Sequence, residues 1–402
     1  MSMEPLIYDA LVIGGGPAGA TAALMLARAG WSVAVVEKKA FPRRKVCGEF
    51  ISATSRPLLR ELGLSERYDA LAGPDVRRVG LYAGDLVLDA AMPKPSSDAA
   101  PWGRALGRER FDLMLLEAAV QAGATQWQPW TVTALQRTEF GHSCHIVRRH
   151  EQQTLEARIV IAAHGSWERG PLPAQGSRSR VASDLIAFKA HFRDSRLPAD
   201  LMPLLVFPGG YGGMVHSDGG RVSLSCCVRR DALADCRRRY SGASAGEAVV
   251  QHIKDSCAGV RATLDGARTD GPILSAGPIR PGIRTRYSDG VFFIGNIAGE
   301  AHPIVAEGIS MAMQSAWLLC RRLIAQPDAA AAPRALTSLG RAYAADWDAA
   351  FALRLRAAAL FANIASRPGA AAFVLPLLRR FPAILTFGAQ LSGKTRDLVA
   401  AA

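Results

Sequence analysis

Apolar positions near the start of the chain predict two buried strands with a helix between them. Leu6 to Ile13 is mostly apolar and is typical of a buried strand. Ala20 to Ala29 is rich in Ala, Leu and Met, which favour a helix, and Gly30 follows as its end. Trp31 to Glu37 favours a second strand. Because an apolar strand leads straight into a glycine-rich turn, the opening residues do not predict a signal peptide.

Further along, the pattern alternates between the two periods. Helical spacing predicts helices in residues 52–64, 108–123 and 303–322, and in the Ala-rich segment beyond 333. Period-two or continuous apolar runs predict strands in residues 130–137, 145–149, 157–163 and 290–294, and several between 184 and 228. Within the last of these, Asp218-Gly219-Gly220 predicts a hairpin. Residues 170–180 are rich in Gly, Pro, Ser and Arg, which indicates a crossing between domains.

The turn after the first strand carries the clearest chemistry. Its Gly14-Gly15-Gly16-Pro17-Ala18-Gly19 run places three glycines as Gly-x-Gly-x-x-Gly, and Glu37 closes the second strand. Gly14 would permit the tight turn, Gly16 a close approach of the backbone to a pyrophosphate, and Gly19 close packing of helix on strand. An acidic residue at this spacing can accept hydrogen bonds from ribose hydroxyls. The unit therefore predicts a site for one dinucleotide.

Composition narrows the remaining classes. The chain has 402 residues, 49% hydrophobic and 21% charged, which is typical of a soluble globular protein with a large core. Its net charge of +13 comes from scattered arginines, which argues against a nucleic-acid partner and fits a pyrophosphate ligand. The seven cysteines form no Cys-x-x-Cys pair, so we expect no disulfide framework, no metal site and a cytoplasmic location. No apolar run approaches the ~20 residues of a membrane span.

With these motifs the chain resembles the FAD-dependent monooxygenases of the para-hydroxybenzoate hydroxylase clan, which includes geranylgeranyl reductases and flavin-dependent halogenases. The glycine turn with Glu37 resembles the start of that clan, and Arg108 to Asp112 its R-x-x-F-D helix. Phe41 to Glu49 resembles a segment seen especially in the geranylgeranyl-reductase branch. Ile159 to Ser166 resembles the family's strand and turn, and Gly295-Asn296 with Pro303 to Ile309 its motif under the flavin.

The resemblance implies a cofactor, FAD, and roles for matching positions. Glu37 would hold the adenosine ribose, Arg108 would lie near the pyrophosphate or flavin, and Val132 would offer backbone contacts to the adenine. Asn296 would meet the ribityl chain or pyrophosphate, and Gly308 and Ile309 would point N–H groups at the flavin. The cofactor-binding set is Gly14, Gly16, Pro17, Ala18, Gly19, Glu37, Lys45, Cys47, Gly48, Arg108, Val132, Asn296, Gly308 and Ile309.

Several single residues leave alternatives open. His164 and Asn296 stand where the family has Asp, and His164 is either a neutral substitute or a change in handling of the nicotinamide donor. Cys47 is a packed residue near the flavin, a covalent anchor for the flavin, or a redox thiol beside basic neighbours. His302 and Glu49 are the candidate catalytic residues, as general acid or base, against a structural role for each.

Taken together, these features predict an α/β protein: a Rossmann-like FAD-binding domain, an inserted β-sheet substrate domain and a helical C-terminal tail. We expect the FAD-binding domain in residues 1–75, 103–180 and 285–330, and the substrate domain in residues 76–102 and 181–284. The helical tail would occupy residues 331–402. That tail mixes apolar stretches with Arg, so it caps the two domains or, as the less favoured alternative, contacts a membrane surface.

The function predicted first is an NAD(P)H-dependent monooxygenase that uses O₂ to hydroxylate an apolar aromatic or polyketide-like small molecule. The alternative is a geranylgeranyl-reductase-like flavin reductase of C=C bonds. A flavin-dependent halogenase is less favoured, because the chain has no W-x-W-x-I-P segment. A non-enzymatic electron carrier is the other class, and the substrate-sized β region argues against it.

Overall fold

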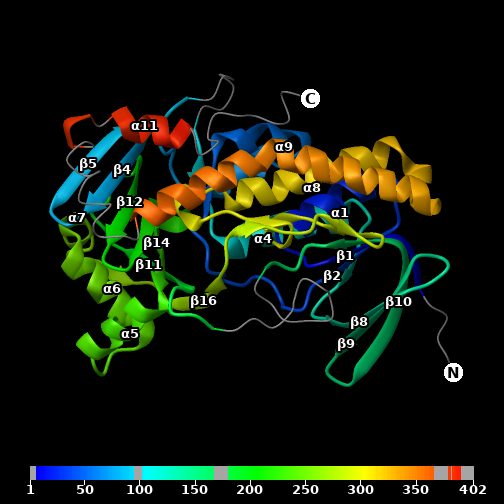
Figure 1. The fold of residues 1–402 in the computed structure, drawn as a ribbon, viewed down its shortest axis with the longest axis horizontal. Helices are drawn as coiled ribbons and strands as arrows, with labels where there is room; N and C mark the ends of the chain where they lie inside the picture. The colour runs from blue at the N-terminus through cyan, green and yellow to red at the C-terminus, as the bar shows by residue number, and fades with distance from the viewer. Residues whose placement is uncertain (1–5, 95–101, 167–179, 366–378, 382, 391–402) are drawn as a thin grey trace.

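The computed structural model describes residues 6–94, 102–166, 180–365, 379–381 and 383–390. Two sheets, each with its own buried apolar cluster, lie side by side, and helices α8 and α9 cross one side of the molecule (Figure 1). The mixed α/β fold with a Rossmann-like first unit confirms the predicted fold class. The predicted domain boundaries stay a prediction.

The first sheet is built around the N-terminal βαβ unit. Its central strands run parallel in the order β19-β10-β1-β2-β7, and β18 joins β19 antiparallel at one edge. All four side chains of β2 and the last four of β1 are buried, which explains the apolar sequence there, whereas Leu6 and Ile7 at the start of β1 are exposed. Strands β8 and β9 extend β10 into an antiparallel meander. The bounds are β1 Leu6–Ile13, β2 Val33–Val36, β7 Thr125–Trp127, β8 Thr131–Arg137, β9 His142–Arg148, β10 Glu151–Ala162, β18 Tyr287–Ser288 and β19 Val291–Phe293.

The second sheet is largely antiparallel. Its order is β15-β11-β14-β13-β12-β4-β5, with β16 also paired to β11 and only β12 and β4 parallel. The predicted hairpin at Asp218 to Gly220 joins β13 to β14. Its strands are β4 Arg78–Ala83, β5 Leu86–Ala91, β11 Leu185–Arg193, β12 Leu201–Phe207, β13 Gly210–His216, β14 Val222–Arg229, β15 Arg268–Thr269 and β16 Leu274–Ile279.

Helices cover both sheets. Helix α1 (Pro17–Arg28) packs on α4 (Arg108–Gln121) and α8 (Gly308–Ala325) beside the first sheet. On the second sheet, α6 (Ala245–Ser256) and α7 (Ala258–Thr263) bury apolar side chains in its core. The shorter elements are α2 Arg56–Glu61, α3 Ser65–Leu71, α5 Arg230–Arg239, α11 Ala383–Ala389, β3 Phe50–Ile51, β6 Arg104–Ala105, β17 Gly282–Ile283 and β20 Gly299–Glu300.

Helix α9 (Pro333–Ala365) bridges the two units. It packs against α8, β17 and β18 on one side and against β13 of the second sheet on the other. Trp347 of α9 lies where any side chain at Gly299 would collide with it, so the helix packs tightly against the first residue of β20. The predicted helical tail is therefore helical to residue 365, and most of it beyond that point lies outside the described residues. Within the described part of the chain, no helix is long and apolar enough to cross a membrane.

Some predicted bounds differ from the structure. Helix α1 begins at Pro17, three residues before the predicted Ala20, because a proline at the first helical position has no N–H to leave unpaired. Strand β10 starts at Glu151, six residues before the predicted Ala157, because its polar first half lies on the solvent side of the β8–β10 meander. The predicted domain crossing at 170–180 falls almost entirely outside the described residues.

Candidate functional site: a cofactor cavity between two sheets

The glycine turn after β1 is a closely packed bend that needs its glycines. Gly14 has φ +109°, and a Cβ there would lie 2.7 Å from the Ala163 carbonyl oxygen. A Cβ on Gly19 would lie 1.8 Å from the carbonyl oxygen of Gly14. Gly16, by contrast, would place a Cβ in ordinary contact, 3.7 Å from Nη2 of Arg108. It occupies the N-cap position of α1, where no side chain caps the helix. The first amides of α1 are thus available to an anion such as a pyrophosphate.

Glu37 has two tasks at this turn. Its carboxylate accepts hydrogen bonds from the backbone N–H of Gly15 and of Lys39, both at 2.9 Å. Each carboxylate oxygen can accept more than one hydrogen bond, so capacity remains for the hydroxyls of a ribose. Val132 lies on β8, two residues after Trp130, whose N–H donates to the Glu37 carbonyl. Val132 is thus close in sequence to a residue that contacts Glu37, and it does not line the cavity described next.

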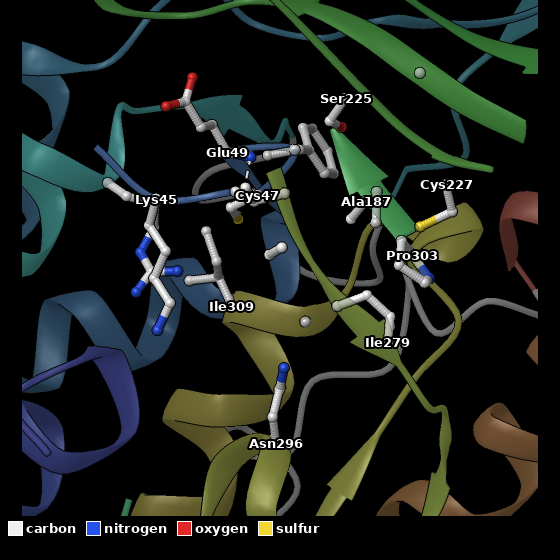
Figure 2. Close-up of a pocket in the computed structure, with 18 of the residues that line it drawn as sticks. Lys45, Cys47, Glu49, Ala187, Ser225, Cys227, Ile279, Asn296, Pro303 and Ile309 are labelled. Carbon is white, nitrogen blue, oxygen red and sulfur yellow. Dashed lines mark hydrogen bonds between the residues drawn. The ribbon is translucent and has the colours of Figure 1, made fainter. Parts of the chain in front are cut away.

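One cavity of about 340 Å³ brings most of the other predicted residues together. Its lining includes the start of α1, the 43–50 loop, Arg108, and the loop from Gly295 to Ile309. The opposite side is formed by β11, β12, β13, β14 and β16 of the second sheet. Figure 2 shows Asn296 and Ile309 on the α8 side and Ala187 and Cys227 on the sheet side. The predicted residues that line it are Gly16, Pro17, Ala18, Lys45, Cys47, Gly48, Glu49, Arg108, Asn296, His302, Gly308 and Ile309.

The N-terminus of α8 faces this cavity. Gly308 and Ile309 form its first turn, no side chain caps that end, and a Cβ on Gly308 would meet no atom within 4 Å. An 18-residue helix presents positive potential at this end, which stabilises negative charge on a bound ring. The amides of α1, the acceptor Glu37 and the amides of α8 therefore fit the pyrophosphate, ribose and flavin of FAD in that order along the chain.

Arg108 and Asp112 form a buried ion pair at the start of α4. The guanidinium donates to both carboxylate oxygens, at 2.6 and 2.7 Å. Although burial disfavours the charged form, Asp112 raises the pKa of Arg108 above its ordinary value. The guanidinium of Arg108 lies beside Gly16, at the start of α1, where its positive charge can contact a phosphate.

Asn296 is paired with a carboxylate that the sequence patterns missed. Its amide donates to Glu300 at 3.1 Å, and Glu300 also accepts from Ser166 at 2.7 Å and Arg284 at 3.3 Å. Burial raises the pKa of Glu300 despite these donors. A carboxylate therefore stays at this loop although Asn replaces the family's Asp. The signal in the sequence that could have identified this carboxylate is the acidic residue between Gly299 and Ala301. His164, the other departure, packs its Cα near Gly14.

Glu49 lies at the cavity edge but forms a structural ion pair. It is fully buried, has φ +65°, and binds Lys189, while His191 lies 3.0 Å away. Although burial opposes ionisation, hydrogen bonding from His191 and the charge of Lys189 lower the pKa of Glu49 well below its ordinary value. In Figure 2 its carboxylate points away from Asn296 and Ile309. This geometry favours a positioning role for Glu49, which ties the 43–50 loop to β11.

The ion pair of Glu49 also determines how the neighbouring residues Cys47 and Gly48 pack. The Cys47 sulfur accepts from the Glu49 N–H at 3.4 Å, and a Cβ on Gly48 would come within 3.2 Å of the Ser225 hydroxyl on β14. The loop is thus pressed against the second sheet at the level of the cavity. This contact is consistent with packing for Cys47.

His302 meets a partner that was not predicted. Its Nδ1 lies 3.1 Å from the hydroxyl of Tyr211 on β13, and Tyr211 also hydrogen-bonds the Cys227 thiol. Burial raises the pKa of Tyr211 well above its ordinary value and lowers the pKa of His302. A protonated phenol therefore faces a neutral imidazole near pH 7. The pair can hold or pass one proton in a cavity whose lining also includes Met202, Met214 and Ile279.

A metal site is not part of this geometry. Among the described residues, no group of three His, Cys, Asp or Glu side chains lies close enough together to hold a metal ion.

Comparison with known proteins also identifies FAD as the cofactor. A family model described as an FAD binding domain matches residues 7–344. Curated relatives include digeranylgeranylglycerophospholipid reductase 2 of Methanopyrus kandleri, 25% identical over 79% of this chain and 75% of its own length. Tryptophan 2-halogenase of Chondromyces crocatus is 26% identical over 77% of this chain and 59% of its own. The chain spans 56–63% of the length of three curated relatives.

Solved structures share the fold. The flavin-dependent brominase Bmp2 superposes with a TM-score of 0.75 at 22% identity, covering 96% of this chain and 94% of its own. A probable FAD-dependent monooxygenase of Pseudomonas aeruginosa gives 0.73 at 18% identity, covering 92% of this chain and all of its own. At these identities the likeness extends to the fold alone.

Proposed function

We propose, from the premise that the chain belongs to the FAD binding domain family and is an FAD-dependent oxidoreductase, that it hydroxylates an apolar aromatic or polyketide-like small molecule. NAD(P)H would serve as reductant and O₂ as the source of oxygen. The observation that carries the proposal is the Tyr211–His302 pair on the roof of the cofactor cavity. A hydroxyl on an electron-rich ring needs one proton-handling partner in an apolar site, and this pair supplies it.

The chain's own residues have separate tasks in this proposal. When bound, FAD would supply the redox chemistry of the net reaction, in which NAD(P)H gives two electrons, one oxygen atom of O₂ enters the substrate and the other leaves as water. The amides of α1 with Arg108 would hold its pyrophosphate, and Glu37 its ribose. Gly308 and Ile309 would point N–H groups at the ring, while Asn296 with Glu300 would face the ribityl chain. The apolar strand residues above would orient the substrate and exclude water.

Mass analysis of the product tests this proposal. Incubated with FAD, NADPH and aromatic candidate substrates, the enzyme should give products heavier by one oxygen, and ¹⁸O₂ should label them. The same mixture without O₂ should give no product. Product that gains two hydrogens under anaerobic conditions would overturn hydroxylation.

Reduction of a C=C bond in an isoprenoid is the second candidate. The Phe41 to Glu49 segment favours it, together with the named activity of the Methanopyrus relative. Polyprenyl substrates belong in the same assay, where anaerobic turnover would support this candidate. Halogenation is less favoured because the chain has no W-x-W-x-I-P segment.

We propose a cytoplasmic location from the state of the cysteines. All seven are free thiols in the structure, which supports a reducing compartment, the cytoplasm.

A further inference from the structure

A second cleft lies beside the cofactor cavity and is lined mainly by charged side chains. Its volume is about 360 Å³. It is formed where the start of α4 meets the turn between β13 and β14, the end of β11 and the loop after β2. The lining consists of Pro42, Arg44, Glu109, Arg110, Arg193, Asp218, Gly219 and Arg221. Arg44 lines this cleft and the cofactor cavity as well, so the two spaces adjoin.

The charges of this cleft form a chain in which the sign alternates. Each carboxylate contacts two guanidinium groups, and the chain begins and ends with an arginine. The order, with nitrogen to oxygen distances, is Arg110 to Asp218 at 3.1 Å, Asp218 to Arg221 at 2.8 Å, Arg221 to Glu109 at 2.8 Å, Glu109 to Arg44 at 3.7 Å, Arg44 to Asp270 at 3.6 Å and Asp270 to Arg193 at 3.1 Å. Four guanidinium groups thus face three carboxylates, which leaves one net positive charge.

The arginines at the two ends of this series of ion pairs are the members most exposed to a ligand. The side chains of Arg110 and Arg193 are 50% and 49% exposed, whereas Arg221 inside the chain is 7% exposed. Both ends are attached to the same turn, because Arg110 pairs with Asp218 and Arg193 donates to the Gly219 carbonyl at 3.0 Å. An anion placed between them would close the alternating chain into a ring. Guanidinium groups in such a fork suit phosphate oxygens.

We propose that this cleft binds the diphosphate of the nicotinamide dinucleotide that reduces the flavin. The proposal rests on the proposed function, which requires such a reductant. Because Arg44 borders both spaces, a dinucleotide whose phosphates lie between Arg110 and Arg193 would have its nicotinamide end directed toward the cofactor cavity. The buried members, Arg221 and Asp218, hold the ends in place, and the exposed arginines make the contacts with the ligand.

Calorimetric titration of the FAD-loaded protein with NADP⁺ and NAD⁺ tests the cleft without any turnover. Arg110→Gln and Arg193→Gln should each raise the Kd about tenfold, and the double variant about 100-fold, since each removes one charge-assisted contact. Inorganic pyrophosphate should compete with both nucleotides in the parent protein. Higher salt should weaken all three ligands, since the ends are exposed.

The matched control is Arg196→Gln, which removes one positive charge from an exposed ion pair with Asp265, and neither of these residues lines the cleft. It should leave the Kd unchanged within twofold, and melting curves should show all variants folded. Nucleotide binding that stays as tight in the double variant as in the parent would overturn the proposal. If that variant loses pyrophosphate binding alone, the cleft serves a phosphorylated substrate, and the reductant assignment is wrong. Oxygenated product formed with chemically reduced flavin, without binding of either nucleotide, would overturn the cleft and leave the monooxygenase standing.

Discussion

At the scale of single residues, the cavity lining combines apolar strand residues with a polar pair, Tyr211 and His302. Tyr211 and His302 come from β13 and from the loop before α8, so neither sits beside the other in the sequence. Their shifted pKa values keep both groups neutral near pH 7. The neutral pair can take the proton of a substrate hydroxyl through the Tyr211 oxygen onto His302, which leaves a negative oxygen on the substrate and a positive imidazolium.

Tyr211→Phe should therefore slow turnover by about 10²-fold with little change in FAD binding, because it removes a proton-handling group and keeps the ring. In the parent, kcat should fall as the pH drops through the lowered pKa of His302, since the imidazole becomes charged below it. That acid limb should be altered in the variant. Tyr287→Phe, which changes a ring packed on Phe292, is the matched control. Equal pH profiles for parent and Tyr211→Phe would refute the assignment.

Glu49 makes a different contribution at this scale. Its folded-state pKa is lowered, so its ionised form stabilises the fold above the ordinary pKa of 4.5, and this stabilisation is lost as the pH falls below that value. Glu49→Gln should lower the melting temperature strongly at pH 7. The difference from the parent should shrink as the pH is taken from 5 toward 3. A difference that is constant with pH would show that the ion pair contributes nothing.

At the scale of elements, two helix N-termini face one cavity. Helix α1 presents amides where a pyrophosphate would lie, and α8 presents amides where a ring would lie. Their glycines differ in purpose. Gly19 is required by packing of α1 on the turn, while Gly16 has room for a side chain unless a ligand occupies that space.

This difference gives a paired prediction. Gly19→Ala should destabilise the protein by about 3 kcal/mol or more, because its Cβ would lie 1.8 Å from the Gly14 oxygen. Gly16→Ala should melt as the parent does without cofactor but bind FAD at least about tenfold more weakly, because the methyl group blocks the phosphate. Thermal melts with and without FAD, together with fluorescence titration, measure both. Normal FAD affinity in folded Gly16→Ala would contradict the cofactor placement.

At the scale of the whole molecule, the two sheets are joined through buried charges as well as helix packing. Lys189 and His191 of β11 reach across to Glu49 on the loop that follows β2. Such a contact stabilises the assembly only while both charges are present, because an unpaired buried charge is strongly unfavourable.

Lys189→Met should therefore cost about 3–5 kcal/mol of unfolding free energy, as should Glu49→Gln. The double variant should lose clearly less than the sum of the two, since neither buried charge remains without a partner. Denaturant unfolding of the four proteins measures the coupling. Strict additivity would mean that the two side chains act independently.

How far the sequence predicts this protein depends on how local each feature is. The N-terminal unit could be predicted because strand, turn, helix and Glu37 lie within a short stretch with its own periodicity. The Tyr211–His302 pair and the Glu49–Lys189 contact could not, since they join residues about 90 and 140 positions apart. The alternating arginine chain is further from prediction, because its members come from five separate segments. Asn296 was identified as a departure, but its partner Glu300 depends on the bend of the loop.

Helix α9 has a consequence for how ligands enter and leave. This 33-residue helix packs against strands of both units, and it contacts β13, the strand that carries Tyr211. A hinge motion that moved the two sheets apart would disrupt the packing of this helix on one of them. We therefore expect ligands to enter and leave the cavity without separation of the two sheets.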